Sequence, residues 1–286
     1  MPLDTQTFAL SRWWAHAALA AVNSDNSIFS APNLRVAKRQ ILAGKNQLIA
    51  IKNWLNTTKL IERDGQSFRL SRFGRCIFEN DKEFRKSSSW WAFHLLACFG
   101  DDPFPYDALF KSLDPNVRQS ITQTTLKNAI YRCANDTAPG SVDTYLEGVL
   151  KMFREDGPLQ GLGLVEQIKG RNSTDLINSE NYWKLGSPRV PDAAVLFALA
   201  LARRKFFIAR PSIAFSELIE KGVNNFLTLS QDNFRRKLST ISNDIKWSGE
   251  IKFDEVANIS SISFGSSFKE EQALIVLLTE GGDSWK

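Results

Sequence analysis

The chain has 286 residues, of which 43% are hydrophobic and 23% charged, with a formal net charge of +5, and this composition is typical of a globular protein with one large domain or two to three small ones. Its three widely spaced cysteines fit neither a disulfide framework nor a paired-cysteine metal site. No apolar run approaches the ~20 residues of a membrane-spanning helix and the N-terminus does not resemble a secretory signal, so we expect a cytoplasmic protein without a membrane partner.

The positive charge is concentrated in one segment. From Arg35 to Arg75 the sequence has ten Lys and Arg residues and two acidic residues, which is a local net charge of +8. The rest of the chain therefore sums to −3. Because like charges this close repel one another unless a polyanion neutralises them, nucleic acid is the first partner to consider.

Three helices are predicted before and within this segment. The first covers Ser11 to Val22, where apolar residues recur at helical spacing. The second is capped by Ser30 and runs to about Leu42, after which Gly44 breaks the chain. The third covers Lys45 to Leu55.

The third helix has two chemically different faces. Leu48, Ile51 and Leu55 form an apolar face that predicts burial. The opposite face is polar and basic, and it is the face that would meet DNA. Trp13, Trp14 and Trp54 are expected to be buried positions that stabilise this part of the protein.

A hairpin is predicted directly after the third helix. Ile61 to Arg63 and Ser67 to Leu70 read as short strands joined by an Asp64-Gly65 turn. A hairpin in this place is the wing of a winged helix-turn-helix, and wings commonly touch the phosphate backbone. The predicted DNA-binding residues are Lys45, Asn46, Ile49, Lys52, Asn53, Arg63, Arg69, Arg72 and Arg75.

The rest of the chain is predicted to be mainly helical. Helices are expected at residues 90–99, 106–113, 119–134, 190–205, 215–222 and 233–241, with weak strand character at 246–263. The last third is either a second winged helix or a generic helical subdomain. The predicted fold is thus mainly α with small β wings: a winged helix-turn-helix domain at 1–86, a helical middle region at 87–180 and a helical C-terminal region at 181–286.

Five blocks of sequence carry a resemblance to a known family. They are Thr7-Phe8 with Arg12-Trp13-Trp14; Gly44-Lys45-Asn46 through Trp54-Leu55 to Leu60-Ile61-Glu62; Leu70 to Gly74; Trp90 to Leu96; and Gly157 to Val165. In their order and separation the chain resembles the bacterial domain-of-unknown-function family that includes SspB, the DNA nickase of the Ssp phosphorothioation defence system. The family usually opens with His-Glu-Thr-Phe, whereas this chain has Thr5-Gln6-Thr7-Phe8.

The resemblance implies a protein that nicks duplex DNA so that partners can replace a phosphate oxygen with sulfur. The implied partners are a cysteine desulfurase, an ATPase and an ATP-pyrophosphatase-like sulfur-transfer protein. It assigns no catalytic residue to this chain.

A nickase needs groups that activate water and stabilise charge on phosphorus, most often around a divalent metal such as Mg²⁺. Asp101 and Asp102, with Asp107 and near His94, form the densest grouping of acids and histidine. The alternative is that Asp101 is a solvated loop acid, that Asp102 belongs to a turn and that His94 is a core histidine. The metal ligands are not identified by the sequence.

Three functions therefore compete. The first is a DNA-binding protein that nicks duplex DNA in a phosphorothioation system, and the second is a non-enzymatic recruiter whose helical remainder docks the ATPase or sulfur-transfer partners. The third is a winged-helix transcriptional regulator, which would be selective for one palindrome if the protein is a homodimer.

Overall fold

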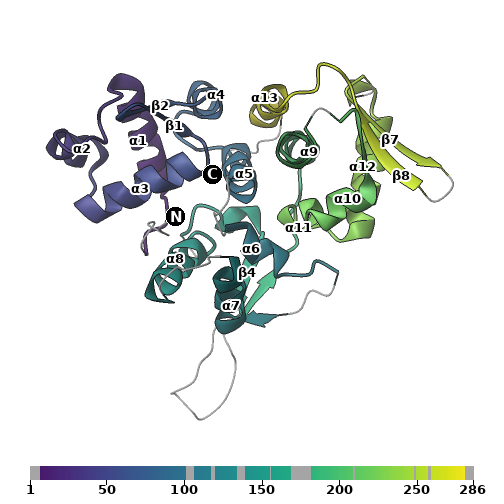
Figure 1. Cartoon of the computed structure of the whole chain (residues 1–286), viewed down its shortest axis with the longest axis horizontal. Coiled ribbons are helices and arrows are strands. Elements are labelled where there is room, and N and C mark those ends of the chain that lie inside the picture. Colours follow the sequence, from purple (N-terminus) through teal and green to yellow (C-terminus); the bar gives the residue numbers. More distant parts are fainter. Residues whose placement is uncertain are drawn as a thin grey trace, which may run out of the picture.

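The computed structural model describes residues 7–100, 106–116, 120–133, 139–154, 156–168, 182–208, 210–247, 249–256 and 259–280. Within these ranges the chain is mainly helical, with three small antiparallel sheets (Figure 1). The mainly helical class with small sheets is therefore confirmed. None of the described helices combines the length and the apolar character that crossing a bilayer requires.

The N-terminal module is the group of elements from residue 12 to residue 80. Its elements are α1 (Arg12–Ser24), α2 (Leu34–Ile41), α3 (Lys45–Thr57), β1 (Ile61–Asp64), β2 (Ser67–Leu70) and α4 (Arg72–Asn80). The three predicted helices and the predicted hairpin are present, whereas α4 was not predicted. The predicted Ser30 cap is wrong, because the N-cap of α2 is Asn33. Side-chain hydrogen bonds from Asn33 to Ser27 and from Ser27 to Asp25 hold the preceding residues in turns instead.

Helix α4 lies directly against the base of the hairpin. Ser71 caps it, because the Gly74 N–H donates a hydrogen bond of 3.0 Å to the Ser71 hydroxyl, which in turn donates to the Lys59 carbonyl. A Cβ atom on Gly74 would lie 1.9 Å from the Leu60 carbonyl oxygen. Only glycine permits this approach, so the first turn of α4 can pack against the backbone of Leu60.

The middle region contains helices and one small sheet. Its elements are α5 (Ser87–Cys98), α6 (Tyr106–Lys111), β3 (Ile121–Thr122), α7 (Gln123–Cys133), α8 (Pro139–Lys151), the 3₁₀ helix η1 (Gln160–Leu162), β4 (Val165–Ile168) and β5 (Tyr182–Leu185). Neither α8 nor the sheet was predicted. The strand order is β3-β5-β4, so β5 joins two strands that are distant in sequence.

The C-terminal module is the group of elements from residue 192 to residue 280. Its elements are α9 (Asp192–Phe206), β6 (Ser212–Ala214), α10 (Phe215–Glu220), α11 (Val223–Phe226), α12 (Gln231–Asn243), the 3₁₀ helix η2 (Ile245–Trp247), β7 (Ile251–Val256), β8 (Ile259–Phe264) and α13 (Glu270–Glu280). The predicted helices are present, and the weak strand character corresponds to the hairpin β7-β8.

Helix α5 is the centre of the core. All of its residues from Ser88 to Cys98 are buried, and it packs against α6, α9 and α13. Its sequence is apolar on every side, which is typical of a helix with no face toward water. The core contains residues from all three predicted regions, and the division of the chain at residues 86 and 180 stays a prediction.

We expect Trp54→Ala to lower the free energy of unfolding by about 3–5 kcal/mol, the usual cost of deleting a buried Trp. The Trp54 indole is fully buried, and its N–H donates to the Phe8 carbonyl at 2.9 Å. The prediction of burial is wrong for Trp13, which is 52% exposed. Trp13→Ala is therefore the matched control, and urea denaturation of both variants is the measurement. Equal losses in the two variants would contradict this account.

Candidate nucleic-acid interface

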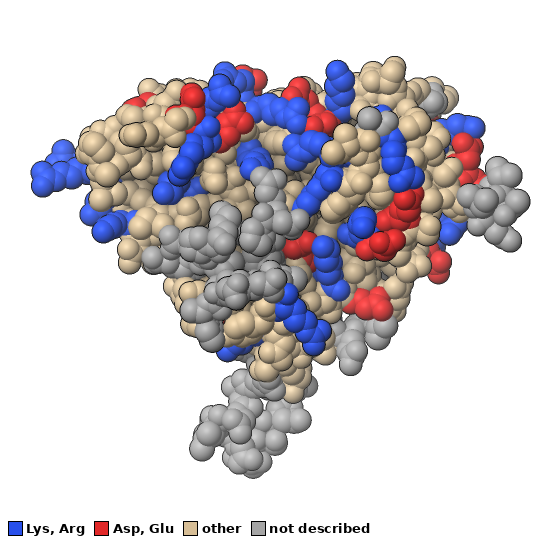
Figure 2. Space-filling view, in the orientation of Figure 1, with Lys and Arg blue, Asp and Glu red and all other residues tan. Residues whose placement is uncertain are grey.

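Helices α2 and α3 form a surface that carries cations without acids. No Asp or Glu occurs in the sequence from Asn26 to Ile61. Figure 2 shows Lys and Arg side chains at the edge of the molecule where α2 lies in Figure 1, whereas basic and acidic side chains are intermixed toward the opposite side. Among the described residues, the exposed cations of this surface that form no ion pair are Arg35, Lys38, Arg39 and Lys45.

Helix α3 turns its predicted apolar face inward. Leu48, Ile51 and Leu55 are buried, whereas Lys45 and Asn46 are exposed and Ile49, Lys52 and Asn53 are partly exposed. The Gly44 N–H donates to the Gln47 side chain at 2.7 Å, which closes the N-terminal turn. The first turn contains no acid. Lys45 therefore adds its charge to the positive end of the helix dipole, where a cation is unfavourable and an anion is stabilised.

The hairpin continues this surface. The side chains of Lys52 from α3 and Arg63 from β1 both lie over the Phe68 ring, with distances of 6.0 and 5.9 Å to its centroid. Two cations from different elements thus lie near the same buried ring. The turn differs slightly from the prediction, because Asp64 pairs with Ser67 and the two-residue loop is Gly65-Gln66.

Arg69 and Arg75 differ in their surroundings. Arg69 lies opposite Glu62 in the strand register and forms an ion pair with it at 2.9 Å. Both side chains are about half exposed, and such surface pairs contribute roughly 0–1 kcal/mol. Arg75 is exposed on α4. The two residues therefore stay on the surface, although on different elements.

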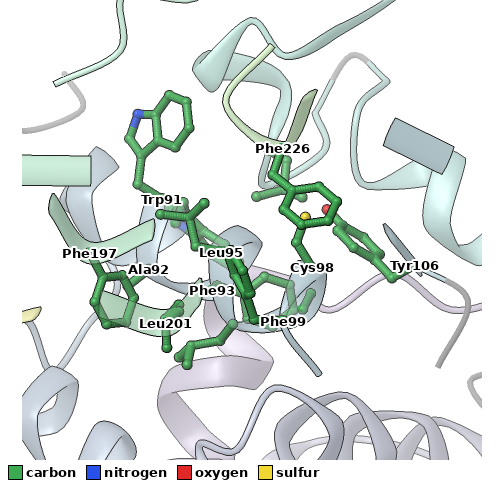
Figure 3. Close-up of a cluster of buried hydrophobic side chains, with 14 of the residues drawn as sticks. Trp91, Ala92, Phe93, Leu95, Cys98, Phe99, Tyr106, Phe197, Leu201 and Phe226 are labelled. Carbon is green, nitrogen blue, oxygen red and sulfur yellow. The ribbon is translucent and has the colours of Figure 1, made fainter. Parts of the chain in front are cut away.

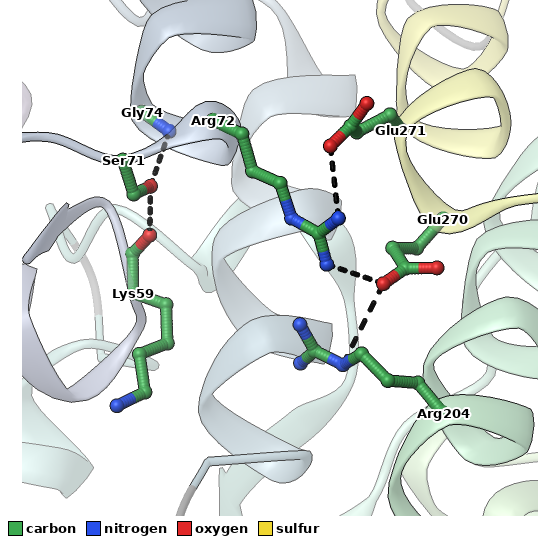
Figure 4. Close-up of polar contacts among 7 residues, drawn as sticks. All are labelled: Lys59, Ser71, Arg72, Gly74, Arg204, Glu270 and Glu271. Atoms are coloured by element: carbon green, nitrogen blue, oxygen red, sulfur yellow. Dashed lines mark hydrogen bonds and ion pairs between the residues drawn. The ribbon is translucent and has the colours of Figure 1, made fainter. Parts of the chain in front are cut away.

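Arg72 belongs to a different environment. Its guanidinium forms ion pairs with Glu270 and with Glu271 of α13, the latter at 2.9 Å, and Arg204 of α9 lies 3.9 Å from Glu270 (Figure 4). Partial burial by itself lowers the pKa of Arg72, but the hydrogen bonds and charges of the two glutamates raise it overall. Arg72 thus connects α4 to the C-terminal module.

His94 lies in the core and not on a surface. It is 0% exposed, its Nε2 is 2.7 Å from the Phe226 carbonyl oxygen and its Nδ1 is 3.1 Å from the Tyr106 hydroxyl. Cys98, Tyr106 and Phe226 belong to the buried cluster drawn in Figure 3. Burial lowers the pKa of His94 to about 4, although its hydrogen bond to the Phe226 carbonyl raises it.

Its burial and contacts agree with the alternative that His94 is a core histidine, neutral at pH 7. Its assignment as a catalytic group stays a prediction. Asp107, which the sequence grouped with it, forms an ion pair with Lys111 at 2.5 Å. Asp101 and Asp102 lie outside the described residues.

Two comparisons with known proteins found matches. The model of a family described as "Protein of unknown function (DUF4007)" matches residues 4–278. The chain belongs to the DUF4007 family. Similar solved structures include a magnesium ion-bound SspB crystal structure, with a TM-score of 0.77, 18% identity and coverage of 98% of this chain and 87% of that one. A second SspB crystal structure has a TM-score of 0.76, 19% identity and coverage of 97% and 86%.

At these identities the likeness to SspB shows a common fold. No curated protein matches the chain. For this DUF4007 chain, the described residues contain no group of three or more His, Cys, Asp and Glu side chains that could hold a metal ion.

We expect the stability of this DUF4007 chain to fall as the pH falls from about 6.5 to 4. In that window His94 is protonated in the unfolded chain but not in the folded one, so unfolding takes up a proton. The full shift corresponds to about 3 kcal/mol, at about 1.4 kcal/mol for each pH unit. The measurement is the free energy of unfolding at several pH values for the wild type and for His94→Gln.

The expected result is a weaker pH dependence in His94→Gln than in the wild type. His16→Gln is the control, because His16 is partly exposed and its Nδ1 contacts only the Lys82 carbonyl among the described residues. Identical pH dependence in the wild type and His94→Gln would show that His94 is not the group that titrates.

Proposed function

We propose that the chain binds duplex DNA through α2, α3 and the β1-β2 hairpin, as a winged helix-turn-helix. The observation that supports this most directly is the acid-free cationic surface of α2 and α3, which continues onto the hairpin through Lys52 and Arg63. Duplex DNA fits this surface because each phosphate contact releases condensed counterions.

In this proposal α3 enters the major groove. Lys45 and Asn46 stand at its exposed N-terminal end, where the recognition helices of helix-turn-helix proteins contact bases. Asn is suited to a bidentate contact with adenine. Lys52, Arg63 and Arg69 would contact phosphates, and Arg69 can leave its weak pair with Glu62 at little cost.

Arg72 is not among the DNA contacts that we propose. Its guanidinium is engaged by two glutamates, and it stands at the base of the hairpin rather than at its tip. Moving it to a phosphate would leave Glu270 and Glu271 without this partner. We assign Arg72 to the contact between the modules, while Arg75 stays a candidate phosphate contact.

We propose further that the chain acts in a bacterial DNA-phosphorothioation defence system and nicks the duplex. This rests on membership of the DUF4007 family and on the likeness to the SspB structures. Asp101 and Asp102 stay the candidate catalytic acids, with a divalent cation such as Mg²⁺ as cofactor. The magnesium ion in one SspB structure supports this choice of metal.

A second candidate is a non-enzymatic recruiter that binds DNA and docks an ATPase, a cysteine desulfurase or a sulfur-transfer partner. Two observations favour it. His94 is sealed in the core, and the part of the chain that the structure describes contains no cluster of metal ligands.

We expect Lys45→Ala to weaken DNA binding and to reduce the slope of log affinity against log salt by about 0.9, the value for one phosphate contact. Lys45 opposes the dipole of α3, so its removal is not expected to lower the melting temperature. Arg72→Ala is the matched control, because it removes the same charge from the same segment at a position paired with acids. Binding is measured on duplex DNA over a range of salt concentrations, and equal changes of slope in both variants would contradict the assignment of these two residues.

We expect the purified chain to convert supercoiled plasmid to open circle with Mg²⁺ or Mn²⁺ and not with EDTA. Asp101→Asn with Asp102→Asn is expected to abolish this conversion and to retain the gel shift, because these acids are proposed to hold the metal. His94→Gln should keep the activity. A gel shift without conversion in either metal would reject the nickase and favour the recruiter.

A further inference from the structure

The two modules share one order of elements. The N-terminal module runs α1, α2, α3, hairpin, α4. The C-terminal module runs α9, α10, α12, hairpin, α13, with β6, the short α11 and η2 as additions. Strand β6 pairs with β8, giving the sheet order β6-β8-β7. This is the order of a winged helix in which α12 takes the place of α3.

The modules meet through equivalent helices. Helices α4 and α13, each the last of its module, pack side by side (Figure 1). Arg72 is the first residue of α4, Glu270 is the first residue of α13, and the two form an ion pair. This ion pair joins the two modules at corresponding positions in their order of elements.

We propose that the outer face of α12 is a second contact surface for duplex DNA, which reads base edges. This rests on the proposed DNA binding by the N-terminal module. Helix α12 has the place in its module that α3 has in the N-terminal module, and we therefore expect it to contact duplex DNA as well.

The outer face of α12 carries amide, hydroxyl and guanidinium side chains beyond a first turn that contains one exposed acid, Asp232. Phe234, Leu238 and Ile241 are buried, whereas Asn233, Arg236, Thr240 and Asn243 are exposed at helical spacing. Arg and Asn make the bidentate contacts with guanine and adenine. The Arg236 guanidinium donates to the Asn233 side-chain oxygen at 2.6 Å, so the two groups are already held together on the surface. The Gln231 N–H donates a hydrogen bond of 3.3 Å to the Asn116 side-chain oxygen. The proposed DNA-contacting face therefore begins after this first residue of α12.

The charges of this module indicate what α12 contributes. Arg235 pairs with Glu255, Lys237 with Asp192 and Lys246 with Glu280. Cations already paired with acids release few counterions from DNA. The α12 face should therefore affect which sequences are preferred, while the salt dependence of binding comes mainly from the N-terminal module.

The test is selection from random-sequence duplexes of about 40 base pairs, long enough for two half-sites about one helical turn apart. The full chain is compared with the double variant N233A/R236A and with N46A. The matched control is K269A/Q272A, which removes one cation from the exposed residue before α13 and one amide from an exposed position of α13. Thermal melting verifies that each variant is folded.

The wild type should enrich two blocks of preferred bases. In N233A/R236A the preference for the selected bases at one block should fall about ten-fold or more, and in N46A the preference at the other block should fall. A good bidentate contact discriminates between bases by that amount. The control should retain both blocks. A single block in the wild type, or two unchanged blocks in N233A/R236A, would overturn the second contact and leave the proposed function intact. Absence of any DNA binding by the wild type would overturn both.

Discussion

The complete burial of helix α5 is the constraint on which the rest of the structure depends. A helix that is apolar on all sides needs neighbours on all sides, and α6, α9 and α13 supply them from later parts of the chain. The last helix, α13, must therefore return to the N-terminal half, where it also packs against α4. Covering this one helix therefore places α9 and α13 of the C-terminal module beside the middle region.

The packing of α4 against α13 divides the cations of the N-terminal module into two groups. Cations on α2 and α3 lie in a stretch of sequence, from Asn26 to Ile61, that contains no acid, and they remain available to a polyanion. On the hairpin, Arg69 is only weakly held by Glu62. Arg72, only a few residues further along, is at the contact of α4 with α13 and is neutralised by two glutamates. A polyanion can therefore compete for the first group without loosening the contact between the modules.

Several features were predictable because they depend on residues close together in sequence. The helical spacing in α1 and α3, and the Asp-Gly signal of the hairpin, predicted elements that the structure contains. The sheet β3-β5-β4 was not predictable, because Ile121 pairs with Trp183 across a long stretch of chain. His94 could be read as a core histidine from its apolar neighbours, but only its contacts with Phe226 and Tyr106 decide this.

The sequence by itself determined the mainly helical class, the cationic segment and the inward face of α3, because periodicity and local charge depend on neighbouring residues. The resemblance to the DUF4007 family could also be read from short blocks of sequence. Only the tertiary structure decided that Arg72 joins two modules, that Trp13 is exposed and that α4 and α13 are in contact. Each of these depends on which distant segments pack together, and that is settled by the burial of apolar surface over the whole chain.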